Sequence, residues 1–342
     1  MNNRQQKLMI MDMTQSGFTH NYPFEPDYGF DLDALLTVPS GQAPEDLALF
    51  WQAKYQDALK VKTHLNLQDS GNVINNWRIF DCYFDSTQEM RIGGWLLLPE
   101  NQPVENAVVM IHGYGGIEQP DTSWNLNNTA LLFLCVRGFG RSAKAPISSE
   151  PRWHVLHNIQ DKQQYILGGC VQDIWCSISA LLTLFPQLNN RIGIAGSSFG
   201  GGIGMFATAF DPRISRAHFH VPTFGNLALR MRLPTWGSTE SVQKFAESHP
   251  SIIHKTLPYF DASCASGFIS QPTHWALALF DPYVAPPGQF SIYNAAGGEK
   301  QLYLQDAGHF AYRNGPKQRR ELRKQLEVYF AQLGKGNASR IS

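Results

Sequence analysis

The sequence predicts an α/β protein: a doubly wound, mostly parallel sheet with helices on both faces and an antiparallel edge near the N-terminus. Two observations support this prediction. From residue 107 onward, short apolar runs of the strand type alternate with longer helical patterns, as in chains built from βαβ units. One of these runs also ends in a glycine-rich turn around Ser198, which is typical of a strand that leads directly into a helix.

An arm, a helix and two strands are expected before the parallel sheet. Residues 1–42 are polar with scattered aromatic side chains, and we expect them to form the arm. A helix begins near residues 43–46, and its apolar positions continue to Tyr55. Residues 77–84 alternate like a strand and residues 92–98 form a second one, so this pair predicts the antiparallel edge.

The parallel part of the sheet is predicted from six apolar runs, with three main helices around them. The expected strands are 107–111, 131–136, 191–195, 217–221, 275–280 and 301–304, and the expected helices are 165–185, 201–209 and 316–333. Residues 140–164 and 223–268 do not fit this alternation, so we expect insertions over the active face. Residues 43–335 therefore form one domain, followed by a tail over residues 336–342.

The composition excludes several classes of function. Of the 342 residues, 43% are apolar and 16% are charged, so a large core is expected. The formal net charge is zero, which argues against nucleic acid or an anionic membrane as a partner. The five cysteines form no C-x-x-C pair, and neither a signal-peptide core nor a transmembrane run is evident. We therefore expect buried thiols and a cytoplasmic protein.

No metal or cofactor is expected. The sequence contains no H-E-x-x-H motif and no Cys/His cluster with the spacing of metal ligands. The segment Gly138-Phe139-Gly140 follows a predicted strand, but it lacks the third glycine of a dinucleotide-binding turn.

The turn around Ser198 carries the main chemical signal. Gly196, Ser198 and Gly200 form a G-x-S-x-G pattern, the nucleophile elbow of α/β-hydrolases. The elbow holds a serine hydroxyl at the end of a strand, where it can attack a substrate. The sequence therefore predicts the α/β-hydrolase fold, with Ser198 as the nucleophile.

A serine nucleophile needs a general base within hydrogen-bonding distance. In this fold the acid and then the histidine follow the serine along the chain. The histidines after Ser198 are at positions 218, 220, 249, 254, 274 and 309. His309 follows the last predicted strand, where the fold places its base. The others lie in strands or in the second insertion, where His249 and His254 remain possible pocket residues.

The acid is expected at the end of a strand that precedes His309. Asp281 directly follows the strand 275–280, and its carboxylate would orient the imidazole. Asp306 is an alternative, although three residues before His309 it is better placed to cap a turn. Asp261, within the second insertion, is a further alternative.

Two backbone N–H groups should form the oxyanion hole. One belongs to Phe199, which follows the nucleophile, and we assign the other to Tyr114 in the glycine-rich loop after the strand 107–111. His112, at the start of that loop, is interpreted as a residue that orients the loop.

Six further segments carry a recognisable pattern: residues 45–51 (EDLALFW), 94–99 (GWLLLP), 112–114 (HGY), 137–139 (RGF), 256–261 (TLPYFD) and 281–287 (DPYVAPP). With these segments, residues 43–332 resemble the acetyl xylan esterase / cephalosporin-C deacetylase family of carbohydrate esterases. This resemblance implies that Ser198, Asp281 and His309 form the triad and that Tyr114 and Phe199 supply the oxyanion donors. It also implies a homo-oligomer, a hexamer in the family.

Three positions depart from the family pattern. Phe199 and Phe139 each stand where the family has glutamine, and Phe310 replaces a glutamate beside the base. We therefore expect a more apolar pocket floor at Phe199, and Arg137 has to find another partner or face solvent. These changes leave the identity of the substrate open.

The expected function is hydrolysis of short-chain acyl esters, acetyl esters in particular, of small molecules such as acetylated sugars. Thioesterase, lactone hydrolase and peptidase activities are alternatives on the same fold, and a non-catalytic binding protein is a further one. Aromatic residues of the insertions either narrow the acyl pocket or pack in the core; they are Trp153, Phe224, Trp236 and Tyr259.

Overall fold

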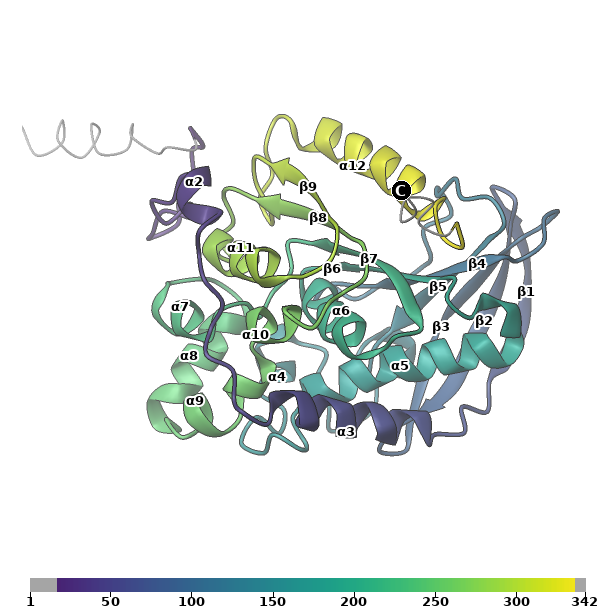
Figure 1. Cartoon of the computed structure of the whole chain (residues 1–342), viewed down its shortest axis with the longest axis horizontal. Helices are drawn as coiled ribbons and strands as arrows, with labels where there is room; N and C mark the ends of the chain where they lie inside the picture. The colour runs from purple at the N-terminus through teal and green to yellow at the C-terminus, as the bar shows by residue number, and fades with distance from the viewer. Residues whose placement is uncertain (1–16, 336–342) are drawn as a thin grey trace, which may run out of the picture.

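A nine-stranded sheet runs through the computed structural model, which describes residues 17–335 (Figure 1). Its strand order is β1-β2-β3-β5-β4-β6-β7-β8-β9. The strands are β1 (Asn66–Ile74), β2 (Trp77–Ser86), β3 (Met90–Pro99), β4 (Asn106–Ile111), β5 (Thr129–Cys135), β6 (Ile192–Ser197), β7 (Ile214–His220), β8 (Thr273–Ala278) and β9 (Lys300–Gln305). The pairs from β1 to β5 along the sheet are antiparallel, and those from β5 to β9 are parallel. The predicted sheet with an antiparallel edge is therefore confirmed.

The eight predicted strands all overlap strands of the structure, whereas β1 was missed. β1 is polar and mostly exposed, with the sequence NLQDSGNVI. The sequence shows no alternation of apolar residues here because the strand has no buried face. Polar side chains suit such an edge, since they discourage pairing with another chain.

Helices cover both faces of the sheet, as predicted. The longer ones are α3 (Leu47–Leu59), α5 (Ile166–Leu184), α6 (Phe199–Phe210), α8 (Ser238–Ser248), α11 (Pro286–Ala295) and α12 (Gly315–Phe330). The shorter ones are α2 (Leu32–Leu35), α4 (Pro151–His154), α7 (Leu227–Arg232), α9 (Ile252–Lys255) and α10 (Ala262–Ser266), with 3-10 turns at Gly140–Ser142, Pro186–Leu188 and Leu257–Phe260. In Figure 1, α3, α5 and α6 lie on one side of the sheet and α12 on the other.

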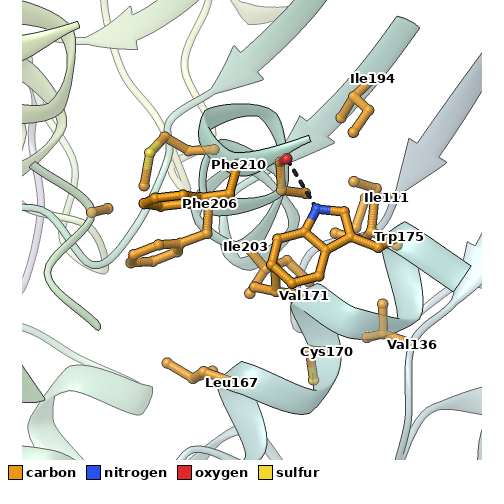
Figure 2. Packing of buried hydrophobic residues seen from close by; sticks show 14 of the residues in the cluster. Ile111, Val136, Leu167, Cys170, Val171, Trp175, Ile194, Ile203, Phe206 and Phe210 are labelled. Atoms are coloured by element: carbon orange, nitrogen blue, oxygen red, sulfur yellow. Dashed lines mark hydrogen bonds between the residues drawn. The ribbon is translucent and has the colours of Figure 1, made fainter. Parts of the chain in front are cut away.

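The two faces of the sheet carry separate apolar clusters because side chains alternate along each strand. In β4, Val109 and Ile111 point to the cluster under α5 and α6, while Val108 points to the cluster under α12. Trp175 lies in the larger cluster, fully buried, and its indole N–H donates a hydrogen bond of 3.1 Å to the Ala207 carbonyl of α6 (Figure 2). This bond lets a polar ring nitrogen be buried at little cost.

Helix α5 is long and apolar enough to cross a membrane by length and composition, but 83% of that window is buried inside the protein. It is the central core helix of the fold, flanked by α3 and α6. The five cysteines, predicted to be buried, are free and buried.

The two predicted insertions carry most of the short elements. Residues 140–164 include α4, and residues 223–268 include α7, α8, α9 and α10. Residues 1–16 of the predicted arm and the predicted tail 336–342 lie outside the described residues. The rest of the arm packs onto the protein: Leu35 is fully buried, and the Pro26 carbonyl accepts a hydrogen bond of 3.0 Å from the Asp281 N–H.

The topology fixes where a site can form. Strand β4 lies between β5 and β6, so the connection from β4 leads to one side of it and the connection from β5 returns to the other side. The loops after β4 and β6 therefore start from the carboxyl ends of neighbouring parallel strands. In doubly wound sheets ligands bind outside the carboxyl ends of the strands at such a switch point.

Candidate active site

Ser198 occupies a strained turn between β6 and α6. Its φ is 55° and its ψ is −113°, a left-handed conformation that is costly for a residue with a side chain. Glycines make the turn possible: a Cβ on Gly196 would lie 2.2 Å from the Gly200 carbonyl oxygen, and one on Gly200 would lie 2.5 Å from the His112 carbonyl oxygen. The Ser198 N–H donates to the His220 carbonyl at 2.8 Å, which holds the turn against β7.

Three side chains predicted to act together meet at this turn. His309 Nε2 lies 2.9 Å from Ser198 Oγ, and His309 Nδ1 lies 2.8 Å from Asp281 Oδ2. Ser198 follows β6, Asp281 comes after β8, and His309 comes after β9. This chain of hydrogen bonds requires Nδ1–H on the imidazole, so Nε2 is free to accept the proton of the hydroxyl.

The Asp281 carboxylate is completely buried and each of its oxygens has donors. Oδ1 accepts from the N–H groups of Tyr283 and Val284, both at 2.9 Å. Oδ2 accepts from His309 and, at 3.2 Å, from Gln289 Nε2. These donors fix the carboxylate in one orientation, and the imidazole with it.

Gln289 was missed by the sequence interpretation. It lies on α11, fully buried, and its Oε1 also accepts from the Ala278 N–H at 3.0 Å. Pro286 and Pro287 at the first positions of α11 are a helix-start signal that could have revealed this helix.

The charge on Asp281 governs the protonation of His309. Burial disfavours the imidazolium, but the Asp281 carboxylate outweighs this effect, and the pKa of His309 is raised above 6.5.

The alternative bases and acids have other partners. His218 and His274 contact each other at 3.1 Å through their Nδ1 atoms. His220 Nδ1 lies 3.0 Å from Ser197 Oγ, and burial lowers its pKa to about 4. His249 stacks on Phe245, and His254 is exposed.

Neither alternative acid contacts His309. Asp306 accepts hydrogen bonds from Asn314 and Gln318, so it organises the turn before α12. Asp261 is buried and accepts from the backbone of Asn226 and Leu227 in the second insertion.

Tyr114 and Phe199 lie on the two loops that flank Ser198. Phe199 is the first residue of α6, where a backbone N–H has no partner within the helix. Within residues 17–335, neither its N–H nor that of Tyr114 donates a hydrogen bond to protein. Both groups are therefore available to a ligand.

His112 holds the loop that carries Tyr114. Its Nδ1 lies 2.7 Å from the Gly113 carbonyl, and its Nε2 accepts from the Val136 N–H at 3.2 Å. Both bonds need the neutral ring with Nδ1–H, and burial lowers the pKa of His112, which agrees with its interpretation as a loop-orienting residue.

The expected apolar pocket floor at Phe199 is wrong. The Phe199 side chain is fully buried and stacks on Tyr114 with ring centres 4.2 Å apart. Phe139 and His154 complete this aromatic cluster. Phe199 and Phe139 therefore pack beneath the loop that carries Tyr114, and neither lines the cavity beside Ser198.

Arg137 finds a partner in Asp173 of α5. Their side chains are 1% and 0% exposed, and the guanidinium lies 2.7 Å from the carboxylate. Phe310 instead packs against Phe280 and against Phe18 and Tyr22 of the arm.

A cavity of about 510 Å³ opens beside Ser198 and His309. Both insertions and the loop after Asp281 contribute to its walls, through Pro151, Trp236 and Tyr283. These three residues also border a neighbouring cavity of about 700 Å³, which Trp153 lines.

The aromatic residues of the insertions divide between the two expected roles. Trp236 and Trp153 are 40% and 60% exposed at these cavities. Phe224 is buried against Phe199, and Tyr259 packs on Phe50 and donates to the Asp46 carboxylate at 2.6 Å, so neither lines the site.

No group of three or more His, Cys, Asp or Glu side chains within residues 17–335 has a geometry that could hold a metal ion.

The fold together with the strained serine turn places the chain in the α/β-hydrolase class. Within this class, a sequence model of the acetyl xylan esterase (AXE1) family matches residues 29–325. The chain therefore belongs to the acetyl xylan esterase family and is a carboxylic ester hydrolase.

Solved structures share the fold at low sequence identity. Acetyl xylan esterase from Paenibacillus sp. R4 superposes with a TM-score of 0.77 and 21% sequence identity, over 87% of this chain and 99% of the other. Acetyl xylan esterase 1 from Thermoanaerobacterium sp. JW/SL YS485 superposes with a TM-score of 0.74 and 18% sequence identity, over 88% of this chain and 99% of the other. The acylaminoacyl peptidase of Pyrococcus horikoshii superposes with a TM-score of 0.59 and 16% sequence identity, over 78% of this chain and 43% of the other.

Proposed function

We propose that this protein is a serine esterase that removes short acyl groups, acetyl in particular, from small substrates such as acetylated sugars. The observation that carries the proposal is the continuous hydrogen-bond chain Ser198–His309–Asp281 at the wall of an open cavity. Membership in the acetyl xylan esterase family supports the choice of acetyl esters.

The proposed reaction proceeds through an acyl-enzyme. Ser198 Oγ attacks the ester carbonyl while His309 Nε2 takes the hydroxyl proton, and the same proton then goes to the leaving alcohol. Asp281 stabilises the imidazolium formed in between. Water, activated by His309, then attacks the acyl-enzyme and releases the carboxylic acid and free Ser198.

The negative charge that develops on the carbonyl oxygen needs preorganised donors. We assign this role to the N–H groups of Tyr114 and Phe199, which donate to no protein acceptor within residues 17–335. Each such donor contributes about 10²–10³-fold to the rate in comparable sites. Both belong to the backbone, so the replacement of a family glutamine by Phe199 leaves this role available.

The size and lining of the cavity favour a small substrate. A volume of about 510 Å³ suits a ligand of one or two sugar rings. Trp236 and Tyr283 are 40% and 38% exposed at its walls, and such half-exposed aromatic rings offer flat surfaces on which the apolar face of a sugar can pack.

The first test removes the nucleophile. We expect Ser198→Ala to lose about 10⁴-fold or more of the ester hydrolysis rate while the protein stays folded by circular dichroism. The matched control is Ser197→Ala, which deletes the neighbouring hydroxyl beside His220 and keeps most of the turnover. Undiminished hydrolysis by the Ser198 variant would refute the proposal.

A second test separates the proposed activity from its alternatives. Acetyl esters, longer acyl esters, thioesters, lactones and aminoacyl peptides are compared by kcat/KM, and we expect the highest values for acetyl esters. A fluorophosphonate probe should label Ser198; a failure to label would indicate a binding protein on the hydrolase fold.

Cytoplasmic location and hexameric assembly stay predictions from the sequence and the family.

A further inference from the structure

Arg230 on α7 carries a buried positive charge that has no counter-ion. Arg230 is only 9% exposed, and its Nε atom is buried without a hydrogen-bond partner. Within residues 17–335 no carboxylate lies within 4 Å of the guanidinium, in contrast to the buried Arg137, which pairs with Asp173. A guanidinium stays protonated in proteins, so Arg230 cannot remove its charge by losing a proton.

The groups around Arg230 compensate this charge only in part. The guanidinium carbon lies 5.1 Å from the centre of the Phe224 ring, a cation–π contact. Asp261 and the phenols of Tyr165 and Tyr114 attract the charge, yet burial is the larger effect and the pKa of Arg230 is lowered. The Asp261 carboxylate already accepts hydrogen bonds from Asn226, Leu227 and Ser263. An isolated buried cation is costly unless something else neutralises it.

Arg230 is one of the residues that line a small cavity. It has a volume of about 20 Å³ and is lined by Arg230, Thr235 and Gly225, among others. The Thr235 hydroxyl is also buried and has no hydrogen-bond partner. Two unsatisfied donors thus border a space that holds one particle of the size of a water molecule.

We propose that this cavity is a binding site for a monatomic monovalent anion such as chloride, held between the Arg230 guanidinium and the Thr235 hydroxyl. An anion of this size fits the space with little adjustment, and it neutralises the charge that no carboxylate neutralises. A water molecule would satisfy the hydrogen bonds but would leave the buried charge.

The site adjoins the loop that holds the catalytic acid. Tyr283 and Val284 line the same cavity, and their backbone N–H groups donate to Asp281 Oδ1. Phe224 packs on Arg230 and also edge-on against Phe199, with the centres of the two phenylalanine rings 6.3 Å apart. Occupation by an anion therefore stabilises the folded protein and holds this loop in place.

The test compares chloride with gluconate, which is too large for the cavity, at constant ionic strength. We expect the melting temperature of the purified full chain to rise saturably with chloride or bromide, by about 4 °C at a hundredfold excess over the dissociation constant. Crystals grown in bromide should show one anomalous peak between Arg230 and Thr235. Neither measurement requires a substrate, so the inference stands apart from the proposed esterase activity.

Three variants sharpen the test. Arg230→Met should abolish the chloride response, and Thr235→Val should raise the half-saturating concentration by about tenfold, since it removes one bond to a charged ligand. Arg232→Met, two residues away on the same helix and exposed, is the control and should keep the full response. If Arg230→Met fails to fold, the Thr235 variant and the bromide crystals decide the question.

The proposal is overturned if chloride and gluconate give the same melting temperature, or if the Thr235 variant responds like the wild type. Electron density for a water molecule without an anomalous bromide peak would also overturn it.

Discussion

The floor and the roof of the site are built differently. We call Ser198, Asp281, His309 and the loop around Tyr114 the floor; all of them lie at the ends of sheet strands. The roof comprises Pro151, Trp153 and Trp236 from the insertions together with Tyr283. Asp281 is fully buried, whereas the two tryptophans of the roof are 40% and 60% exposed. The ends of the sheet strands position the floor, whereas the short helix α4 and two loops form the roof.

Under the proposed function, the floor carries out the reaction and the roof selects the substrate. A change in the floor misplaces reacting atoms and should affect every ester alike. A change in the roof should affect only those substrates large enough to reach it.

The largest effect is expected from Asp281→Asn. The amide cannot orient or stabilise the imidazolium, so kcat should fall by about 10⁴-fold while KM changes little. Steady-state kinetics with a simple acetate ester measures this. Asp306→Asn is the matched control and should keep near-normal activity, because the Asp306 carboxylate accepts hydrogen bonds from Asn314 and Gln318 at the start of α12 and none from His309. A comparable loss in the Asp306 variant would instead make Asp306 the acid.

The scaffold under the floor should be sensitive to the buried pair Arg137–Asp173. Asp173→Asn leaves a buried guanidinium without its charge partner, which destabilises proteins by about 3–5 kcal/mol. Urea unfolding measures the loss. Glu240→Gln, which breaks the exposed pair with Lys244, is the control and should change the free energy of unfolding by less than about 1 kcal/mol. Equal losses in the two variants would contradict the structural role of the buried pair.

The raised pKa of His309 predicts the acid side of the pH profile. The base must be neutral, so kcat/KM should fall tenfold per pH unit below a midpoint above 6.5. In Asp281→Asn only burial acts on the imidazole, and the midpoint of the residual activity should move to lower pH. A midpoint that is the same in both proteins would contradict this assignment.

The raised pKa of His309 also makes the stability of the folded protein depend on pH, in the direction opposite to that of the activity. Because the folded pKa exceeds the unfolded value, the charged pair stabilises the fold fully below pH about 6.5. This contribution is lost as the pH rises through the folded pKa. Activity should therefore increase over the range in which this contribution to stability disappears.

The floor could be predicted from the sequence because its residues stand at strand ends that apolar runs reveal. Ser198 was identified by its glycines, and Asp281 and His309 by the strands 275–280 and 301–304. The structure brings these three residues together. The family resemblance, which the sequence model of the family confirms, points to the same residues.

The surroundings of the floor were not predictable in the same way. Gln289 lies on α11, and although Pro286 and Pro287 signal the start of a helix, nothing in the sequence pairs this glutamine with Asp281. Asp173 lies within the predicted apolar helix 165–185, and nothing in the sequence indicates that it pairs with Arg137. Tyr259 lies in an insertion, as Trp236 does, but only the structure shows that one packs in the core and the other lines the cavity. Contacts between distant segments depend on tertiary packing, which local patterns do not contain.

The smallest effect, and the one that tests the roof, is expected from Trp236→Ala. Loss of a ring against which a sugar packs should raise KM for an acetylated oligosaccharide by about two- to tenfold. KM for 4-nitrophenyl acetate, which is too small to span the cavity, should stay the same, and so should kcat for both. Phe268→Ala removes an aromatic ring of similar exposure far from the site and is the control. If Trp236→Ala impairs both substrates equally, the tryptophan supports the floor, and the division between floor and roof fails at this residue.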